Sequence, residues 1–169
     1  MAPQTVIIPE VIEPDEKLPR DLVALRRFAF LLDEAVAIPG TTRRIGLDGA
    51  IGLIPGVGDV IGALLSTWII IGALRHRVPL MKVARMVVNV LVDMIIGDIP
   101  VFGDIFDFLF EENVMNLQLL LRYRDRSRPP RSFTSIAVSA FLIICFILAV
   151  GLILLVLTIA AVFWLIQHR

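Results

Sequence analysis

The sequence predicts an all-α membrane protein made of two repeated helix–break–helix hairpins and a C-terminal transmembrane helix. Three observations lead to this fold class. The 169 residues are 57% hydrophobic and 19% charged, with a mean hydropathy of +0.86, whereas soluble domains are about half apolar and a quarter charged. One segment recurs at an offset of 45 residues, and the C-terminal region holds a run of 31 residues without a charge.

The uncharged run extends from 136 to 166. About 20 consecutive apolar residues cross the hydrocarbon of a bilayer, so this helix is long enough to span it with tilt. Phe163 and Trp164 stand near its end, and aromatic rings of this kind favour the headgroup region. Residues 135–169 are therefore predicted to be a C-terminal transmembrane anchor.

The internal repeat pairs residues 48–64 with residues 93–109. Glycine and proline interrupt a helix in each copy, and an aspartate then precedes a new apolar run, where a carboxylate caps the helix start. The repeat predicts two copies of one helical unit, whose second helices would cover Val60–Leu74 and Ile105–Leu121. The motif residues are Asp48, Gly52, Pro55, Gly58 and Asp59 in the first copy, and Asp93, Gly97, Pro100, Gly103 and Asp104 in the second.

The repeat lies in a predicted helical domain at residues 21–123. A first helix is expected from Asp21, as its cap, to about Ala37, because Leu22, Leu25 and Leu32 fall on one helical face. Another helix is expected after Pro79, with a narrow polar stripe. Residues 1–20 are acidic and carry regularly spaced prolines, so they are predicted to form a disordered tail.

Residues 124–134 form a predicted basic linker before the anchor. Cationic flanks stay on the cytoplasmic side of a membrane, so the N-terminal side is expected in the cytoplasm, at the inner membrane if the protein is bacterial. The same side chains could bind anionic lipid headgroups. Arginines also flank each repeat, so if the units enter the membrane both ends of each are expected on the cytoplasmic side; the alternative is a cytoplasmic helical domain that lies against the bilayer. The arginines assigned to topology or headgroup contact are Arg122, Arg124, Arg126, Arg128 and Arg131.

The sequence offers no set of catalytic, cofactor-binding or metal-binding residues. Cys145 is the only cysteine, so an internal disulfide is excluded. His76 and His168 lack metal-ligand companions at suitable spacing, and Ser66 has no nearby histidine to activate it. The formal net charge is zero, which predicts no nucleic-acid partner. The chain is therefore expected to be no enzyme, with no cofactor and no identified small-molecule substrate.

The segment Leu31–Ala63 contains LLD, then IPGT, then GLD and GLIPGVGD, and a second block reads IPVFGD. In this pattern the chain resembles the bacterial and fungal domain of unknown function 4112, over roughly Leu25 to Tyr123. The resemblance implies short, apolar, helical relatives with no established activity. It supplies no catalytic residue, and the C-terminal anchor lies outside it.

The predicted function is that of a non-enzymatic integral membrane protein with a structural or scaffolding role. Its partners would be the lipid bilayer and further copies of itself, because broken helices within a bilayer need protein or water around them. The alternative is a subunit of a small oligomeric channel or transporter that uses the aspartates at the helix breaks. Replacing Asp59 and Asp104 by asparagine and measuring ion flux separates the two.

Overall fold

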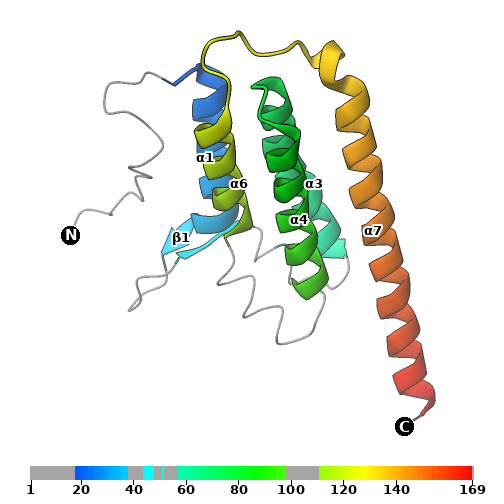
Figure 1. The fold of residues 1–169 in the computed structure, drawn as a ribbon. Helices are drawn as coiled ribbons and strands as arrows, with labels where there is room; N and C mark the ends of the chain where they lie inside the picture. Colours follow the sequence, from blue (N-terminus) through cyan, green and yellow to red (C-terminus); the bar gives the residue numbers. More distant parts are fainter. Residues whose placement is uncertain (1–17, 38–43, 48–50, 52–56, 98–110, 169) are drawn as a thin grey trace.

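A computed structural model describes residues 18–37, 44–47, 51, 57–97 and 111–168 of the chain. Within them the fold is all-α, with five helices and one pair of very short strands (Figure 1). The elements are α1 (Arg20–Glu34), β1 (Val36–Ala37), β2 (Arg44–Ile45), α3 (Val57–Arg75), α4 (Leu80–Gly97), α6 (Glu112–Tyr123) and α7 (Phe133–Gln167).

The helices pack side by side and successive helices run in opposite directions (Figure 1). The start of α1, the turn between α3 and α4, the end of α6 and the start of α7 meet at one end of the bundle. The linker between α6 and α7 crosses this end, which we call the linker end. α3 and α4 stand between α7 on one side and α1 with α6 on the other.

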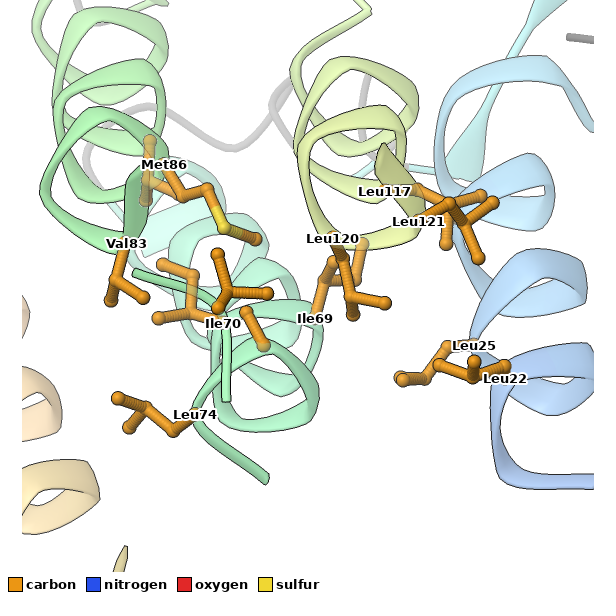
Figure 2. Close-up of a cluster of buried hydrophobic side chains, with 14 of the residues drawn as sticks. Leu22, Leu25, Ile69, Ile70, Leu74, Val83, Met86, Leu117, Leu120 and Leu121 are labelled. Carbon is orange, nitrogen blue, oxygen red and sulfur yellow. The ribbon is translucent and has the colours of Figure 1, made fainter. Parts of the chain in front are cut away.

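The core lies between α1, α3, α4 and α6 (Figure 2). Leu22 and Leu25 reach in from α1, as their helical spacing predicts, and meet Leu120 and Leu121 of α6. These four side chains are at most 5% exposed. The remaining labelled members come from α3, α4 and α6: Ile69, Ile70, Leu74, Val83, Met86 and Leu117.

Two glycines let helices approach closely. A Cβ atom on Gly72 of α3 would lie 2.4 Å from a methyl carbon of Leu25 and 3.2 Å from one of Leu120. A Cβ atom on Gly151 of α7 would lie 2.7 Å from a methyl carbon of Val60 on α3. The first glycine therefore sets the spacing of α3 to α1 and α6, and the second sets that of α7 to α3.

α7 packs against the bundle along one stripe only. Ile136, Ile147 and Gly151 are buried, but only 11% of its most apolar stretch is covered by the rest of the protein. With 35 residues the helix is about 52 Å long, and it continues past the ends of its neighbours (Figure 1). Among the described residues it is the one helix long and apolar enough to cross a membrane, over Phe133–Ala161.

The first helix is shorter than the sequence predicts. α1 ends at Glu34, and Val36 and Ala37 pair antiparallel with Ile45 and Arg44. The two strands therefore run in opposite directions beside the C-terminal end of α1. The returning backbone passes so close to α1 that a Cβ atom on Gly46 would lie 1.4 Å from the carbonyl oxygen of Leu32, so no residue with a side chain fits there.

The same strand pair shows where the two ends of the first repeat unit lie in the bundle. Arg44, just before the unit, lies in β2 next to the C-terminal end of α1, whereas Arg75, just after it, lies at the linker end beside Asp21. The two ends of this unit therefore lie at opposite ends of the bundle. The ends are separated because a single helix, α3, runs the length of the bundle.

The other boundaries agree more closely. α4 begins directly after Pro79, as predicted, and α3 begins at Val57, three residues before its predicted start. α6 ends at Tyr123, while the predicted start at Ile105 lies outside the described residues. The anchor helix includes the whole predicted run from 136 to 166.

We predict that Gly72→Leu loosens the bundle. The added side chain would displace Leu25 and Leu120, and overpacking of this kind costs about 1–3 kcal/mol. The measurement is the thermal unfolding midpoint of the full chain in nonionic detergent. Ala24→Leu is the matched control, because Ala24 is exposed on α1. Equal midpoints for the two variants would contradict the close approach at Gly72.

Candidate functional site

The linker is fastened to the turn between α3 and α4 by two backbone hydrogen bonds. The amide of Asp125 donates to the carbonyl of His76 at 2.9 Å, and the amide of Arg131 donates to the carbonyl of Arg75 at 2.8 Å. These bonds satisfy carbonyls that the end of a helix leaves without an intrahelical partner. They also hold the linker across the linker end instead of leaving it as a free tether.

Side chains of the turn reach the same linker. Nε of Arg75 donates to the carbonyl of Arg131, and Nε of Arg77 donates to the carbonyl of Pro129, each at 3.4 Å. Arg77 has a backbone φ of 59°, in the left-handed region that is uncommon for residues other than glycine, asparagine and aspartate. The turn therefore holds two arginines against the linker.

Four of the five arginines assigned to topology or headgroup contact are exposed: Arg122, Arg126, Arg128 and Arg131. Arg128 is 69% exposed and forms a loose ion pair with Asp125 at 3.7 Å. Arg124 differs from them, because it is 8% exposed and donates a hydrogen bond to the carbonyl of Leu121. Its guanidinium thus satisfies the last turn of α6, a favourable position for a cation.

Aromatic side chains lie directly next to these arginines. Phe133, the first residue of α7, stacks with Trp68 of α3 at a centroid distance of 6.4 Å. The guanidinium of Arg75 lies over the Phe133 ring, 4.2 Å from its centroid. Both rings are about half exposed, at 51% and 52%. From the linker end along α7, the arginines are therefore followed by an exposed aromatic zone and then by the uncharged apolar surface of the helix.

An ion pair joins α1 to the turn. Nε2 of His76 lies 2.8 Å from Oδ2 of Asp21, and Arg75 approaches the same oxygen at 3.6 Å. An ionised carboxylate only accepts, so Nε2 carries the donated hydrogen. Burial raises the pKa of Asp21, but the hydrogen bond and charge of His76, the amide of Leu22 and Arg75 outweigh it, so this pKa lies below its ordinary 3.8.

Asp125 orders the start of the linker. Its Oδ1 accepts hydrogen bonds from the hydroxyl of Ser127 at 2.6 Å and from the Ser127 amide at 2.9 Å. These bonds, together with Arg128 and Arg77 nearby, hold the pKa of Asp125 below its ordinary value. The carboxylate therefore stays ionised in neutral solution and offsets part of the positive charge of the linker end.

A buried polar cluster connects three helices away from the linker end. Asn116 of α6 donates from Nδ2 to Oε2 of Glu112 at 2.8 Å and to the carbonyl of Met86 at 3.3 Å, and its Oδ1 accepts from Asn89 of α4 at 2.8 Å. The hydroxyl of Ser66 on α3 binds the other oxygen of Glu112. Glu112 is 1% exposed, and Ser66 and Asn116 are completely buried. We call these residues the polar junction.

Asp33 ties α1 to the start of α6. Its Oδ1 accepts from Nδ2 of Asn113 at 2.7 Å, and its Oδ2 accepts from the amide of Val114 at 2.8 Å. A carboxylate bound to a free amide at a helix start caps that helix. Asp33 therefore performs for α6, from another helix, the capping that the sequence assigned to the aspartates of the repeat.

The polar junction was not predicted from the sequence. Glu112 and Asn116 stand four residues apart, a spacing that places them on one helical face, and this was the available signal. Their partners on α3 and α4 could be identified only from the packing. The hydroxyl of Ser66 also binds the carbonyl of Gly62, and in the described part of the chain no group of three or more His, Cys, Asp or Glu could hold a metal ion.

Few of the predicted motif residues fall in the described part of the structure. Asp93 is half-buried on α4, and Gly97 is the last residue of that helix. Gly58 and Asp59 lie in the first turn of α3, without a described side chain for Asp59. Outside the described residues lie Asp48, Gly52, Pro55, Pro100, Gly103 and Asp104.

A scan against protein-family models matches residues 21–123 to the domain of unknown function DUF4112. The chain belongs to the DUF4112 family. The matched residues begin in α1 and end with α6, so the DUF4112 domain includes the core and the polar junction, while α7 lies outside it. No curated protein and no solved structure matches the chain.

The Asp21–His76 contact predicts a pH-dependent loss in Asp21→Asn. The pKa of Asp21 is lowered by folding, so the ionised form stabilises the fold above the unfolded-state pKa, and this contribution disappears as pH falls through the folded pKa. We expect Asp21→Asn to lower the free energy of unfolding by up to about 1 kcal/mol at pH 7, and by much less near pH 3. Unfolding curves at both pH values measure the difference.

His76→Gln and the double variant complete a double-mutant cycle for this pair. Coupling between the two substitutions at pH 7 that declines on acidification supports the ion pair. A loss that is the same at pH 7 and pH 3, or no coupling, would show that Asp21 acts by some other contact.

The polar junction predicts a large loss in Asn116→Leu. The substitution removes donors from Glu112 and the Met86 carbonyl and the acceptor of Asn89, and each buried group left unsatisfied costs about 1–3 kcal/mol. Gln118→Leu is the control, because it makes a similar change at a half-exposed position of the same helix. Unfolding free energies that agree within about 0.5 kcal/mol, the usual range for surface changes, would contradict a stabilising role for the junction.

Proposed function

We propose that this protein is a non-enzymatic integral membrane protein with a structural role, anchored by α7. One observation carries the proposal: α7 has no charged residue from Phe133 to Ile166 and is left largely uncovered by its own fold. Burial of apolar surface is worth roughly 25 cal/mol per Å², so a helix of this kind is stable when hydrocarbon surrounds it.

The packing of α7 on α3 supports a particular depth for the bundle. The two helices contact each other from Trp68 and Phe133 at the linker end to Val60 and Gly151 at the other. Beyond Gly151 only 16 residues of α7 remain, about 24 Å of helix, which is less than the roughly 30 Å of bilayer hydrocarbon. The bilayer must therefore also enclose part of α7 that touches α3.

The outward surfaces of α3 and α4 agree with this depth. α3 exposes Ile61, Leu64 and Trp68, and α4 exposes Val88 and Ile95. Large apolar surfaces of this kind mark a contact with lipid or protein. We infer that the hairpin of α3 and α4 enters the bilayer beside α7, with the linker end in the cytoplasmic headgroup region, because cationic flanks resist translocation.

The side of the bundle away from α7 supports self-association. Arg27 is exposed on α1, seven residues below Arg20 and so about 10 Å from the linker end. A cation at this depth is costly in hydrocarbon and needs protein, water or a route to the headgroups. Copies of the chain that meet through this side would keep Arg27 out of lipid, which is the basis for proposing a homo-oligomeric scaffold.

The channel or transporter alternative depends on Asp59 and Asp104, and the side chains of both lie outside the described residues. No contact among the described residues favours it. The anchored structural role is therefore the function that we propose.

The proposal predicts a labelling pattern for cysteines in intact membranes. Cys145 is the only cysteine and lies twelve residues into α7, about 18 Å from Phe133 and so near the centre of the hydrocarbon. We expect a membrane-impermeant maleimide to label it only after denaturation. In a Cys145→Ala background, Ser127→Cys should react from the cytoplasmic side and Gln167→Cys from the other side.

The same full-length chain should stay with membranes after an alkaline carbonate wash and form oligomers by native mass spectrometry in detergent. Equal labelling of Cys145 before and after denaturation, or release by carbonate, would overturn the anchor. A strictly monomeric chain would overturn self-association and leave the anchor in place.

A further inference from the structure

We propose that the linker end is a binding surface for the phosphate groups of anionic phospholipids, formed by Arg75 and Arg77 of the α3–α4 turn together with Arg126, Arg128 and Arg131 of the linker. The inference rests on the proposed membrane anchoring, and it goes further by assigning a ligand class to a folded surface. The turn arginines belong to the surface, whereas Arg124 does not, because it is buried against Leu121.

Positive charge is concentrated at the linker end, although the chain as a whole has a formal net charge of zero. Residues 20–21, 75–77 and 122–131 together hold eight arginines and two aspartates. Both aspartates are engaged, Asp21 with His76 and Arg75, and Asp125 with Ser127 and Arg128. Guanidinium groups present several N–H donors in a rigid fork that fits two phosphate oxygens, so the excess of arginines favours a phosphate ligand.

The arginines are held in place by the fold. The linker cannot swing away without breaking its backbone hydrogen bonds to Arg75 and His76, and the turn arginines also hold the linker through Nε. Arg77 occupies a left-handed backbone conformation that glycine would adopt with less strain. Strained positions persist where the surrounding structure determines them, and they concentrate at binding sites. The backbone conformation at position 77 does not favour arginine, so we attribute the presence of arginine to a binding role of its side chain.

The order of the zones selects a bilayer headgroup over a soluble anion. Phe133 and Trp68 form the border directly below the guanidinium groups, and aromatic rings of this kind settle at the headgroup level. The uncharged surface of α7 follows at once. A phosphate held by the arginines would thus have its acyl chains beside α7, an arrangement that a free phosphate cannot use.

Lipid titration of the full-length protein in nonionic detergent tests the surface. Binding of phosphatidylglycerol and of phosphatidylcholine is counted by native mass spectrometry, with inorganic phosphate as a competitor. We expect phosphatidylglycerol to bind preferentially and inorganic phosphate not to displace it. Arg77→Gln with Arg131→Gln should weaken phosphatidylglycerol binding on the order of thirtyfold, from about 1 kcal/mol for each arginine near an anionic surface.

Matched variants make the result specific. Arg85→Gln removes one positive charge from an exposed position on α4, and it should bind phosphatidylglycerol like the wild type, whereas Arg131→Gln alone should weaken binding. Arg77→Lys with Arg131→Lys keeps the charge but loses the fork, so its affinity should fall between those of the wild type and the double glutamine variant.

Three results would overturn the inference: equal binding of the two lipids, equal weakening by Arg131→Gln and its control Arg85→Gln, or displacement of lipid by inorganic phosphate. Carbonate extraction of the Arg77→Gln, Arg131→Gln variant distinguishes rejection of the headgroup surface from rejection of the proposed membrane anchoring. If that variant stays in the membrane and binds phosphatidylglycerol as the wild type does, the anchor holds and the headgroup surface is rejected. If the wild type is released by carbonate, both proposals fail.

Discussion

The structure depends on how the uncharged surface of α7 is solvated. α3 and α4 bury one stripe of this helix, and its other sides are exposed. Because the contact stripe continues as far as Gly151, α7 cannot enter hydrocarbon without taking its neighbours part of the way. Under the proposed anchoring, the position of the whole bundle in the bilayer follows from one helix–helix contact, in which a glycine permits close packing where lipid would give no hydrophobic drive for association.

At the linker end, many positive charges lie beside an apolar surface and must be stabilised there. Arg124 binds the carbonyl end of α6, Arg75 lies beside Asp21 and over the ring of Phe133, and the backbone of the linker is paired with the turn. Arg124 and the linker backbone thereby pair with carbonyls that a helix end leaves unsatisfied. The remaining guanidinium groups face outward on a backbone that is already ordered, so little further ordering entropy opposes binding of a ligand there.

Local pattern was enough to predict α4 and α7 and the buried face of α1. The start of α4 follows from a proline, α7 from an uncharged run, and Leu22, Leu25 and Leu32 from helical spacing. The features that the sequence did not predict depend on contacts between segments that are distant in the sequence. The pairing of Val36 with Ile45 depends on the path of the chain over α1, and Arg124 looks like its exposed neighbours in sequence but folds back on the end of α6. Asp33 reaches its partners in α6 some 80 residues away, a distance that no local pattern spans.

The polar junction has a role that the apolar core cannot fill. α3 is apolar around most of its circumference, so contacts among leucine and isoleucine side chains would tolerate several rotations and shifts against α4 and α6. Hydrogen bonds are directional, and a buried carboxylate without its donors is costly. Glu112 and Asn116 therefore penalise any register in which Ser66 and Asn89 do not face them, much as single buried polar residues select register in coiled coils. In a bilayer, where lipid competes equally well for the apolar faces, such a junction fixes one arrangement of the helices.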